Sequence, residues 1–150
     1  MSDPLFRRLC IIGAGLIGSS LARLVRERGD IARHLVVHDS SAAVIGRVRA
    51  LGIADTVEPN PVRAVEGCDA VVLCVPVGAY HGVMSVIAAH LAPGCVLSDV
   101  GSTKSSVLRD LLPLLPEGVH LVPGHPMAGT EFSGPDAGFA ALFQGRWVCL

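Results

Sequence analysis

The stretch at residues 9–21 constrains the fold of this chain more than any other. An apolar run at 9–12 passes into the turn Gly-Ala-Gly-Leu-Ile-Gly at 13–18, and the residues that follow have helical spacing. A strand, a glycine turn and a helix in this order are typical of dinucleotide-binding folds. The alternative is a glycine-containing loop between a core strand and a core helix that binds no ligand. The context on both sides of the turn favours the dinucleotide interpretation.

Each glycine of the turn has a separate expected role. Gly13 allows the tight turn, Gly15 lets the backbone approach a pyrophosphate, and Gly18 lets the helix pack closely on the strand. The backbone N–H groups of the first helical turn, at Leu16 and Ile17, face the phosphates together with the positive end of the helix dipole. We therefore expect these five residues to bind the cofactor.

The composition favours a single α/β domain. The chain has 150 residues, of which 51% are hydrophobic and 17% charged, against roughly 25% charged in ordinary domains. A low charged fraction suits a parallel sheet that is covered on both faces, because its strands need no polar side. The length is sufficient for one domain with a full core.

Charge, composition and the length of the apolar runs argue against nucleic-acid and membrane partners. The net charge is −1 and the aromatic fraction is 4%, so neither the basic surface nor the stacking platforms of nucleic-acid binding are indicated. We expect no membrane segment, because every apolar run is shorter than a bilayer requires, and we find no signal-peptide pattern at the N-terminus.

The five cysteines have no CxxC spacing. We expect them to be free, buried thiols of a cytoplasmic protein.

Apolar runs alternate with segments of helical periodicity along the whole chain. This alternation predicts a doubly wound, mostly parallel sheet of the Rossmann type. The last strand is followed by neither a turn nor a cap, so we expect residues 1–150 to be one dinucleotide-binding domain that is truncated before a further domain. The expected strands lie at 9–12, 34–38, 56–57, 70–75, 95–99, 120–122 and 146–150.

Asp39 is the expected ribose ligand. It ends the second strand, 21 residues after Gly18, where a carboxylate accepts hydrogen bonds from the adenosine ribose hydroxyls. The alternative role, capping the helix that follows, is compatible with the first. A carboxylate there repels a 2′-phosphate, which favours NAD over NADP. Arg47, in the following helix, is the main argument for NADP.

Three further loops follow strands and are expected at the same edge of the sheet, where ligands of open parallel sheets bind. They are Val75-Pro76, which we expect to contact the cofactor, and residues 99–104 and 124–131. His125, in the last loop, is the strongest candidate for proton chemistry because histidine titrates near neutrality. A structural histidine is the alternative. The remaining five histidines have no comparable position, and we expect no metal site.

For each of the other polar residues of these loops, a structural or solvent-exposed role is the alternative to a functional one. Ser102 either caps the helix after it or binds cofactor or substrate. Lys104 either serves an anionic group or is a solvated lysine. Glu131 either orients the substrate or is an ordinary loop carboxylate.

With these loops in view, the chain resembles prephenate and arogenate dehydrogenases, the cyclohexadienyl dehydrogenases of tyrosine biosynthesis. The resemblance covers essentially the whole chain. It is carried by IIGAGLIGSSLA at 11–22, DVGSTK at 99–104 and, most specifically, GHPMAGTEFSG at 124–134. No position in these motifs departs from the family pattern.

The resemblance implies NAD(P)-dependent oxidative decarboxylation of prephenate to 4-hydroxyphenylpyruvate, of arogenate to tyrosine, or of both. It implies that His125 and Ser102 contact the ring hydroxyl, and that Glu131, with its neighbour Thr130, belongs to the substrate pocket. It also implies a C-terminal helical domain that forms a homodimer.

Two alternatives stay open. One is another Rossmann dehydrogenase, of the 3-hydroxyacid or 6-phosphogluconate type, which would need a catalytic lysine on a later helix and would lack the motif around His125. The other is a nucleotide-sensing module without catalysis.

Overall fold

The computed structural model describes residues 3–150, and its centre is a six-stranded sheet in the order β3-β2-β1-β4-β5-β6. All five strand pairs are parallel, as the alternation of strands and helices predicts. The strands are β1 (Phe6–Ile12), β2 (Ala32–His38), β3 (Thr56–Val57), β4 (Ala70–Leu73), β5 (Val96–Asp99) and β6 (His120–Val122).

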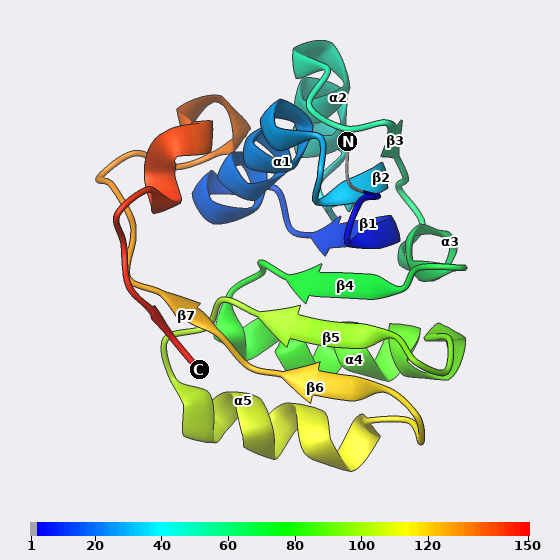
Figure 1. Ribbon diagram of the computed structural model, residues 1–150. Helices are drawn as coiled ribbons and strands as arrows, with labels where there is room; N and C mark the ends of the chain where they lie inside the picture. Colours follow the sequence, from blue (N-terminus) through cyan, green and yellow to red (C-terminus); the bar gives the residue numbers. More distant parts are fainter. Residues whose placement is uncertain (1–2) are drawn as a thin grey trace.

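Helices cover both faces of the sheet, with α1 and α2 on one side and α4 and α5 on the other (Figure 1). Short 3-10 turns connect or extend them. The helices are α1 (Leu16–Arg28), α2 (Ala42–Leu51), α3 (Pro61–Val65), α4 (Tyr80–Ile87) and α5 (Lys104–Leu111), and the 3-10 turns are η1 (Val77–Ala79), η2 (Ala88–His90), η3 (Leu112–Leu114), η4 (Pro135–Ala137) and η5 (Ala140–Phe143).

The two helical layers produce two apolar cores, one on each face of the sheet. Strand β1 contributes to both because successive side chains point to opposite faces. Leu9 and Ile11 pack under α1 and α2, whereas Cys10 and Ile12 pack under α3, α4 and α5. Because β1 is buried on both sides, no position at its end faces solvent, and this explains its continuous apolar run.

Steric constraints account for two of the three glycines of the turn. Gly13 has a φ of +99°, and a Cβ built there would lie 2.7 Å from the carbonyl carbon of Cys74. A Cβ at Gly18 would lie only 1.8 Å from the carbonyl oxygen of Gly13. Gly15 has open space around it, which leaves its backbone free to meet a ligand. The sequence-based roles of Gly13 in the turn and Gly18 in close packing agree with this geometry.

The C-terminal part departs most from the expected pattern. The strand expected at 146–150 is only β8 (Val148–Cys149), and it pairs antiparallel with a short strand, β7 (His125–Pro126), in a separate two-stranded sheet. His125 therefore lies on a strand and not in an irregular loop. Between β7 and β8, the chain forms η4 and η5, and both pack on α1.

The cysteines are all free, and Cys10, Cys68 and Cys95 are buried as expected. The expectation is wrong for Cys149, which is exposed because β8 lies at the edge of the small two-stranded sheet, and Cys74 is only half-buried. Within residues 3–150, no helix combines the length and the apolar character that crossing a membrane requires.

Candidate functional site

Five of the eight residues predicted to hold a dinucleotide line one cleft at the carboxyl edge of the sheet. The other three, Leu16, Ile17 and Gly18, begin α1 and are not among its lining. In Figure 1 the arrowheads of β1, β4 and β5 point to this edge. The cleft has a volume of about 310 Å³, and its lining includes Gly13, Gly15, Asp39, Val75 and Pro76. The structure therefore brings together the glycine turn, the end of β2 and the loop after β4. The other lining residues are Ile12, His38, Ser40, Cys74, Ala79 and Val83.

The Asp39 carboxylate is held in place by two backbone N–H groups. Ala14 N donates to one oxygen and Ser41 N to the other, both over 2.9 Å. The helix after it is capped by Ser41, whose hydroxyl accepts from Val44 N over 3.3 Å. Asp39 thus ties the glycine turn to the start of α2. Its carboxylate oxygens keep further lone pairs for donors in the cleft.

The start of α1 has the character of an anion site. Its N-cap is Gly15, which has no side chain to satisfy the first N–H groups, and no acidic residue lies in its first turn. The unpaired N–H groups at Leu16, Ile17 and Gly18 and the positive end of the helix dipole therefore favour a phosphate at this position. The open space around Gly15 fits the same ligand.

Asp99, at the end of β5, is the central polar residue of the second half of the site. Its side chain has no solvent exposure. Gly101 N (2.8 Å) and the Tyr80 hydroxyl (3.1 Å) donate to Oδ2, and Gly124 N (3.1 Å) donates to Oδ1. Lys104 Nζ lies 2.5 Å from Oδ2. A buried carboxylate is tolerated because all of these donors satisfy it.

Lys104 has a structural role. Its ammonium group donates to Gly124 O over 2.6 Å in addition to Asp99, and three quarters of the side chain is shielded from solvent. It is therefore not the solvated lysine that the sequence allowed, and the anionic group that it serves in this structure is the Asp99 carboxylate. Asp99 and Lys104 hold the two sides of Gly124 through its N–H and its carbonyl.

This arrangement positions both predicted catalytic residues. Gly101 and Gly124, which bind the same Asp99 carboxylate, directly precede Ser102 and His125. One carboxylate thereby links the loop after β5 to the strand β7. Sequence reasoning missed Asp99 and Tyr80 as site residues, although an aspartate at the end of an otherwise apolar strand was a detectable signal.

The side chains of the predicted catalytic residues are accessible. His125 is half-buried and Ser102 is exposed. The N-cap of α5 is Thr103, and no side chain makes a capping hydrogen bond there. The capping role considered for Ser102 is therefore wrong, because Ser102 precedes the cap position. Its hydroxyl is free for another partner.

The substrate residues suggested by the resemblance lie beyond β7. Thr130 and Glu131 are both exposed. The Thr130 hydroxyl accepts from Phe132 N over 3.2 Å, which gives it a local turn contact. No hydrogen bond joins Glu131 to His125 or Ser102 in the part of the chain that the structure describes. Both residues thus follow β7 closely in the sequence, but neither makes a hydrogen bond to a residue that lines the cleft in the described part of the chain.

Two further titratable groups near Asp99 stay neutral. Burial, reinforced by the Asp99 carboxylate, raises the pKa of the Cys74 thiol to about 12. The same two causes raise the pKa of the Tyr80 hydroxyl well above its usual value. Neither group is therefore a nucleophile or a base at neutral pH.

The remaining histidines have structural or surface positions. His34 Nε2 pairs with the Thr56 hydroxyl over 2.8 Å, and His38 Nδ1 with Glu58 O over 2.9 Å. His81, His90 and His120 are exposed. Among residues 3–150, no group of three or more histidine, cysteine or carboxylate side chains is arranged to hold a metal ion.

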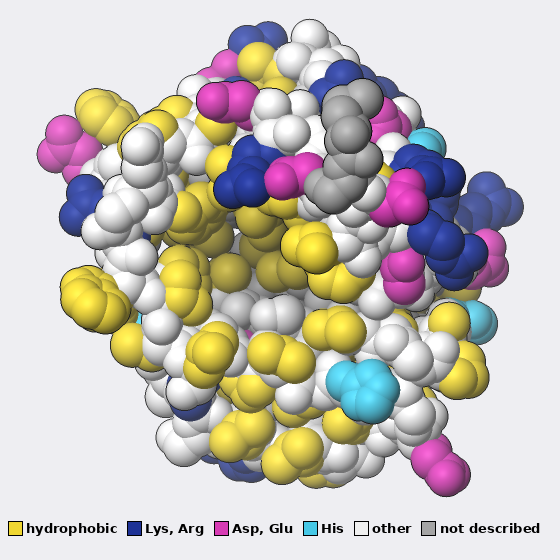
Figure 2. All heavy atoms as spheres, in the orientation of Figure 1, with side chains coloured by type: hydrophobic (Ala, Val, Ile, Leu, Met, Phe, Trp, Pro, Cys, Tyr) yellow, Lys and Arg dark blue, Asp and Glu magenta, His cyan; other side chains and the backbone are white. Residues whose placement is uncertain are grey.

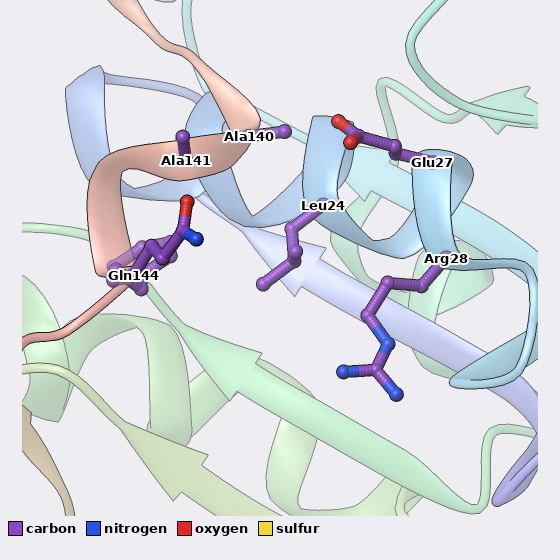
Figure 3. Close-up of a pocket in the computed structure, with 7 residues that line it drawn as sticks. Leu24, Glu27, Arg28, Ala140, Ala141 and Gln144 are labelled. Atoms are coloured by element: carbon purple, nitrogen blue, oxygen red, sulfur yellow. The ribbon is translucent and has the colours of Figure 1, made fainter.

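A second cavity lies away from this edge. It has a volume of about 410 Å³ and is formed by the last turns of α1 and by residues 140–144. Figure 3 shows Leu24 and Arg28 pointing from α1 into this gap, with Gln144 on the other side. None of the predicted site residues is among those that line it.

An apolar surface lies over β4, β5 and β6 on the α1 side of the sheet. Two adjoining cavities of about 280 and 290 Å³ open there, and Figure 2 shows hydrophobic side chains around this hollow. Both cavities are lined by Leu21, Val72 and Ser98. No helix of the described residues covers this part of the sheet in the way that α1 covers β1.

Comparison with known proteins identifies the family. The family described as prephenate dehydrogenase, nucleotide-binding domain, matches residues 21–150. A cyclohexadienyl dehydrogenase from Zymomonas mobilis is 45% identical, over 97% of this chain and 49% of its own length. A prephenate dehydrogenase from Lactococcus lactis is 32% identical, over 96% of this chain and 40% of its own length.

Solved structures agree with this match. The crystal structure of prephenate dehydrogenase from Aquifex aeolicus, in complex with hydroxyphenyl propionate and NAD+, superposes with a TM-score of 0.84 at 28% identity, over 95% of this chain and 49% of that one. The fold is also that of Synechocystis arogenate dehydrogenase, with a TM-score of 0.84 at 24% identity over 94% and 48% of the two chains.

The fold and the cleft define a nucleotide-binding domain of the Rossmann type. The chain belongs to the prephenate dehydrogenase family. It spans about half the length of the curated relatives that it matches.

The ion pair of Lys104 and Asp99 yields a prediction about stability. We expect Lys104→Met to lower the free energy of unfolding by about 3 kcal/mol, because Asp99 would stay buried without its cation. Denaturant titration followed by circular dichroism measures the change.

Arg28→Met is the matched control, since Arg28 forms an exposed ion pair with Asp30 at the far end of α1. Exposed pairs contribute little, so this variant should unfold like the unmodified protein. Equal losses in the two variants would contradict the structural role of Lys104.

Proposed function

We propose that the protein is a dehydrogenase that oxidatively decarboxylates prephenate, arogenate or both, with NAD as the hydride acceptor. The observation that carries the proposal is the Asp99 carboxylate, which accepts from the backbone N–H groups of Gly101 and Gly124, the residues before Ser102 and His125. Asp99 ends β5 at the same carboxyl edge of the sheet as the cleft with dinucleotide-binding features. The named activities of the relatives, cyclohexadienyl and prephenate dehydrogenase, support this substrate class.

The reaction removes a hydride from the ring carbon that bears the hydroxyl group, and carbon dioxide leaves as the ring becomes aromatic. NAD supplies the hydride acceptor when it is bound. His125 accepts the hydroxyl proton, the role that histidine most often has in general acid–base catalysis. Ser102 hydrogen-bonds the same hydroxyl and orients it. Asp99 accepts from the backbone N–H groups that precede both residues, which fixes the backbone from which the two side chains extend.

Substrate binding involves the exposed loop after β7 in this proposal. Glu131 and Thr130 belong to the specific motif of that loop and contact the substrate. The apolar surface over β4, β5 and β6, which Asp99 and Pro126 help to line, excludes water from one side of the substrate ring. A 3-hydroxyacid dehydrogenase is a weaker candidate, because the motif around His125 is not expected in that class and Lys104 is already held by Asp99 and Gly124.

We propose a preference for NAD over NADP. Asp39 supports it, since a carboxylate in this position accepts from the ribose hydroxyls and repels a 2′-phosphate. The free state of all five cysteines supports a reducing compartment, the cytoplasm.

We also propose that a C-terminal helical domain follows in the whole protein and forms a homodimer. The relatives are about twice as long as this chain, and the apolar surface over β4, β5 and β6 offers a place for further residues to pack. Light scattering tests the proposal: we expect a dimer for the full-length protein and a monomer for residues 1–150. A dimer of the shorter chain would contradict it.

The role of His125 predicts a selective loss of turnover. His125→Asn removes the base but keeps a polar side chain, so we expect turnover to fall by about 100-fold or more with little change in the affinity for NAD. The measurement is a nicotinamide-reduction assay on the full-length protein, with prephenate and arogenate each combined with NAD and NADP.

His120→Asn is the control for this substitution. His120 is exposed on β6, shortly before His125 in the chain, and its variant should retain the original turnover. A weaker affinity for NAD with unchanged turnover at saturating NAD in His125→Asn would remove His125 from the chemistry. An unmodified protein that turns over neither substrate with either cofactor would contradict the proposed function.

The role of Asp39 predicts a change in cofactor preference. We expect Asp39→Ala to weaken NAD about tenfold more than NADP, because NAD loses its charge-assisted hydrogen bonds and NADP is relieved of repulsion. Losing only the contacts to Ala14 and Ser41 would weaken both cofactors equally, so the ratio of dissociation constants isolates the ribose role. An unchanged ratio would contradict it.

A further inference from the structure

Arg47 and Asp136 form an ion pair between segments that are far apart in the sequence. Arg47 Nε lies 2.8 Å from each carboxylate oxygen, and Nη2 lies 2.6 Å from Oδ1. The two residues are 89 positions apart, Arg47 on α2 and Asp136 on η4. This geometry uses both oxygens of the carboxylate and more than one nitrogen of the guanidinium, which makes it directional as well as electrostatic.

The backbone around Asp136 is fixed by contacts that do not depend on the ion pair. Arg23 Nη1, on α1, donates to Pro135 O over 2.8 Å, and the Ser20 hydroxyl accepts from Phe139 N over 3.0 Å. A Cβ at Gly138 would lie 2.2 Å from the Ser19 hydroxyl oxygen, so this segment lies directly on α1 (Figure 1). Asp136 is therefore presented to Arg47 by an anchored segment.

Arg47 lies on the helix that begins beside the cofactor edge, although it does not itself line the cleft. It is five residues after Ala42, the first residue of α2, or about 7.5 Å along the helix axis. Helical side chains lean toward the N-terminus of their helix, so a released guanidinium would extend back toward the first turn of α2. That turn closely follows Asp39 and Ser40, which line the cleft.

The charges around this part of the cleft favour a ribose without a phosphate. The residues next to Asp39 are Ser40 and Ser41, which carry no charge. Arg23 is engaged by Pro135 O and also faces Asp136. The Arg47 guanidinium holds the pKa of the Asp136 carboxyl below its usual range, so the pair is ionised at neutral pH.

We propose that Asp136 determines cofactor choice by keeping Arg47 occupied, and that Arg47 is a latent site for the 2′-phosphate of NADP. In folds of this class, an arginine near the ribose-binding carboxylate accommodates a 2′-phosphate. Asp136 neutralises Arg47 through the ion pair. The inference rests on the proposed binding of NAD and assigns a specificity-determining role to a residue outside the cleft.

The test compares cofactor affinities of the purified full-length protein by isothermal titration calorimetry. We expect Asp136→Asn to improve the affinity for NADP relative to NAD by about tenfold, the gain expected from one new charge-assisted contact to a phosphate. The affinity for NAD itself should stay unchanged, because Asp136 is not among the residues that line the cleft.

Two further variants separate the possible causes. Asp136→Asn combined with Arg47→Leu should lose the gain, because the phosphate ligand is gone. Asp30→Asn makes the same change of charge and frees Arg28 at the C-terminal end of α1. This variant should leave the ratio of NADP to NAD affinity unchanged.

Each outcome decides between the proposals. An unchanged ratio in Asp136→Asn, with NAD still bound, would overturn this inference alone. A gain that persists without Arg47 would also overturn it, since the gain would then come from reduced repulsion only. Failure of the unmodified protein to bind either dinucleotide would overturn the proposed function as well.

Discussion

The buried carboxylate of Asp99 is the interaction on which the candidate site depends. It lies at the end of a central strand, has no exposure to solvent, and binds donors from α4, from the start of α5 and from the residue before β7. A buried charge is costly unless it is fully partnered. The loops around it are therefore held in one arrangement, because moving either of them would leave the charge without its donors. Ser102 and His125 take their places from this arrangement.

A second set of contacts ties the end of the chain to the half of the domain that contains the glycine turn. Residues 134–143 pack on α1 through Ser20 and Arg23 and reach α2 through the pair of Asp136 and Arg47. The segment therefore runs from the predicted substrate loop to the helices at the cofactor cleft. The structure thus connects the two parts of the reaction that we propose, hydride acceptance at the glycine turn and proton acceptance at His125, through contacts that are far apart in the sequence.

Local chemistry made the fold and the cofactor cleft predictable. The parallel sheet followed from apolar runs punctuated by Gly and Pro, and the positions of Gly13 and Gly18 followed from the steric needs of one turn. The role of Arg47 was not predictable, because Asp136 is 89 positions away and is brought close only by tertiary structure. Lys104 is five positions from Asp99, but the carbonyl of Gly124, its second partner, reaches it only through the tertiary fold. The position of Ser102 one residue before the helix cap was missed because capping patterns do not fix a boundary to one residue.

The central claim is that the proton goes to His125 while the hydride goes to a dinucleotide in the cleft of the glycine turn. The most direct test is a crystal structure of the full-length protein with NAD and a non-reactive analogue of the cyclohexadienol substrate. We predict a ring nitrogen of His125 within about 2.6–3.2 Å of the analogue's hydroxyl oxygen, and the NAD ribose on Asp39. A complex in which the hydroxyl group points away from His125, or in which the ribose lies outside the cleft, would contradict this claim.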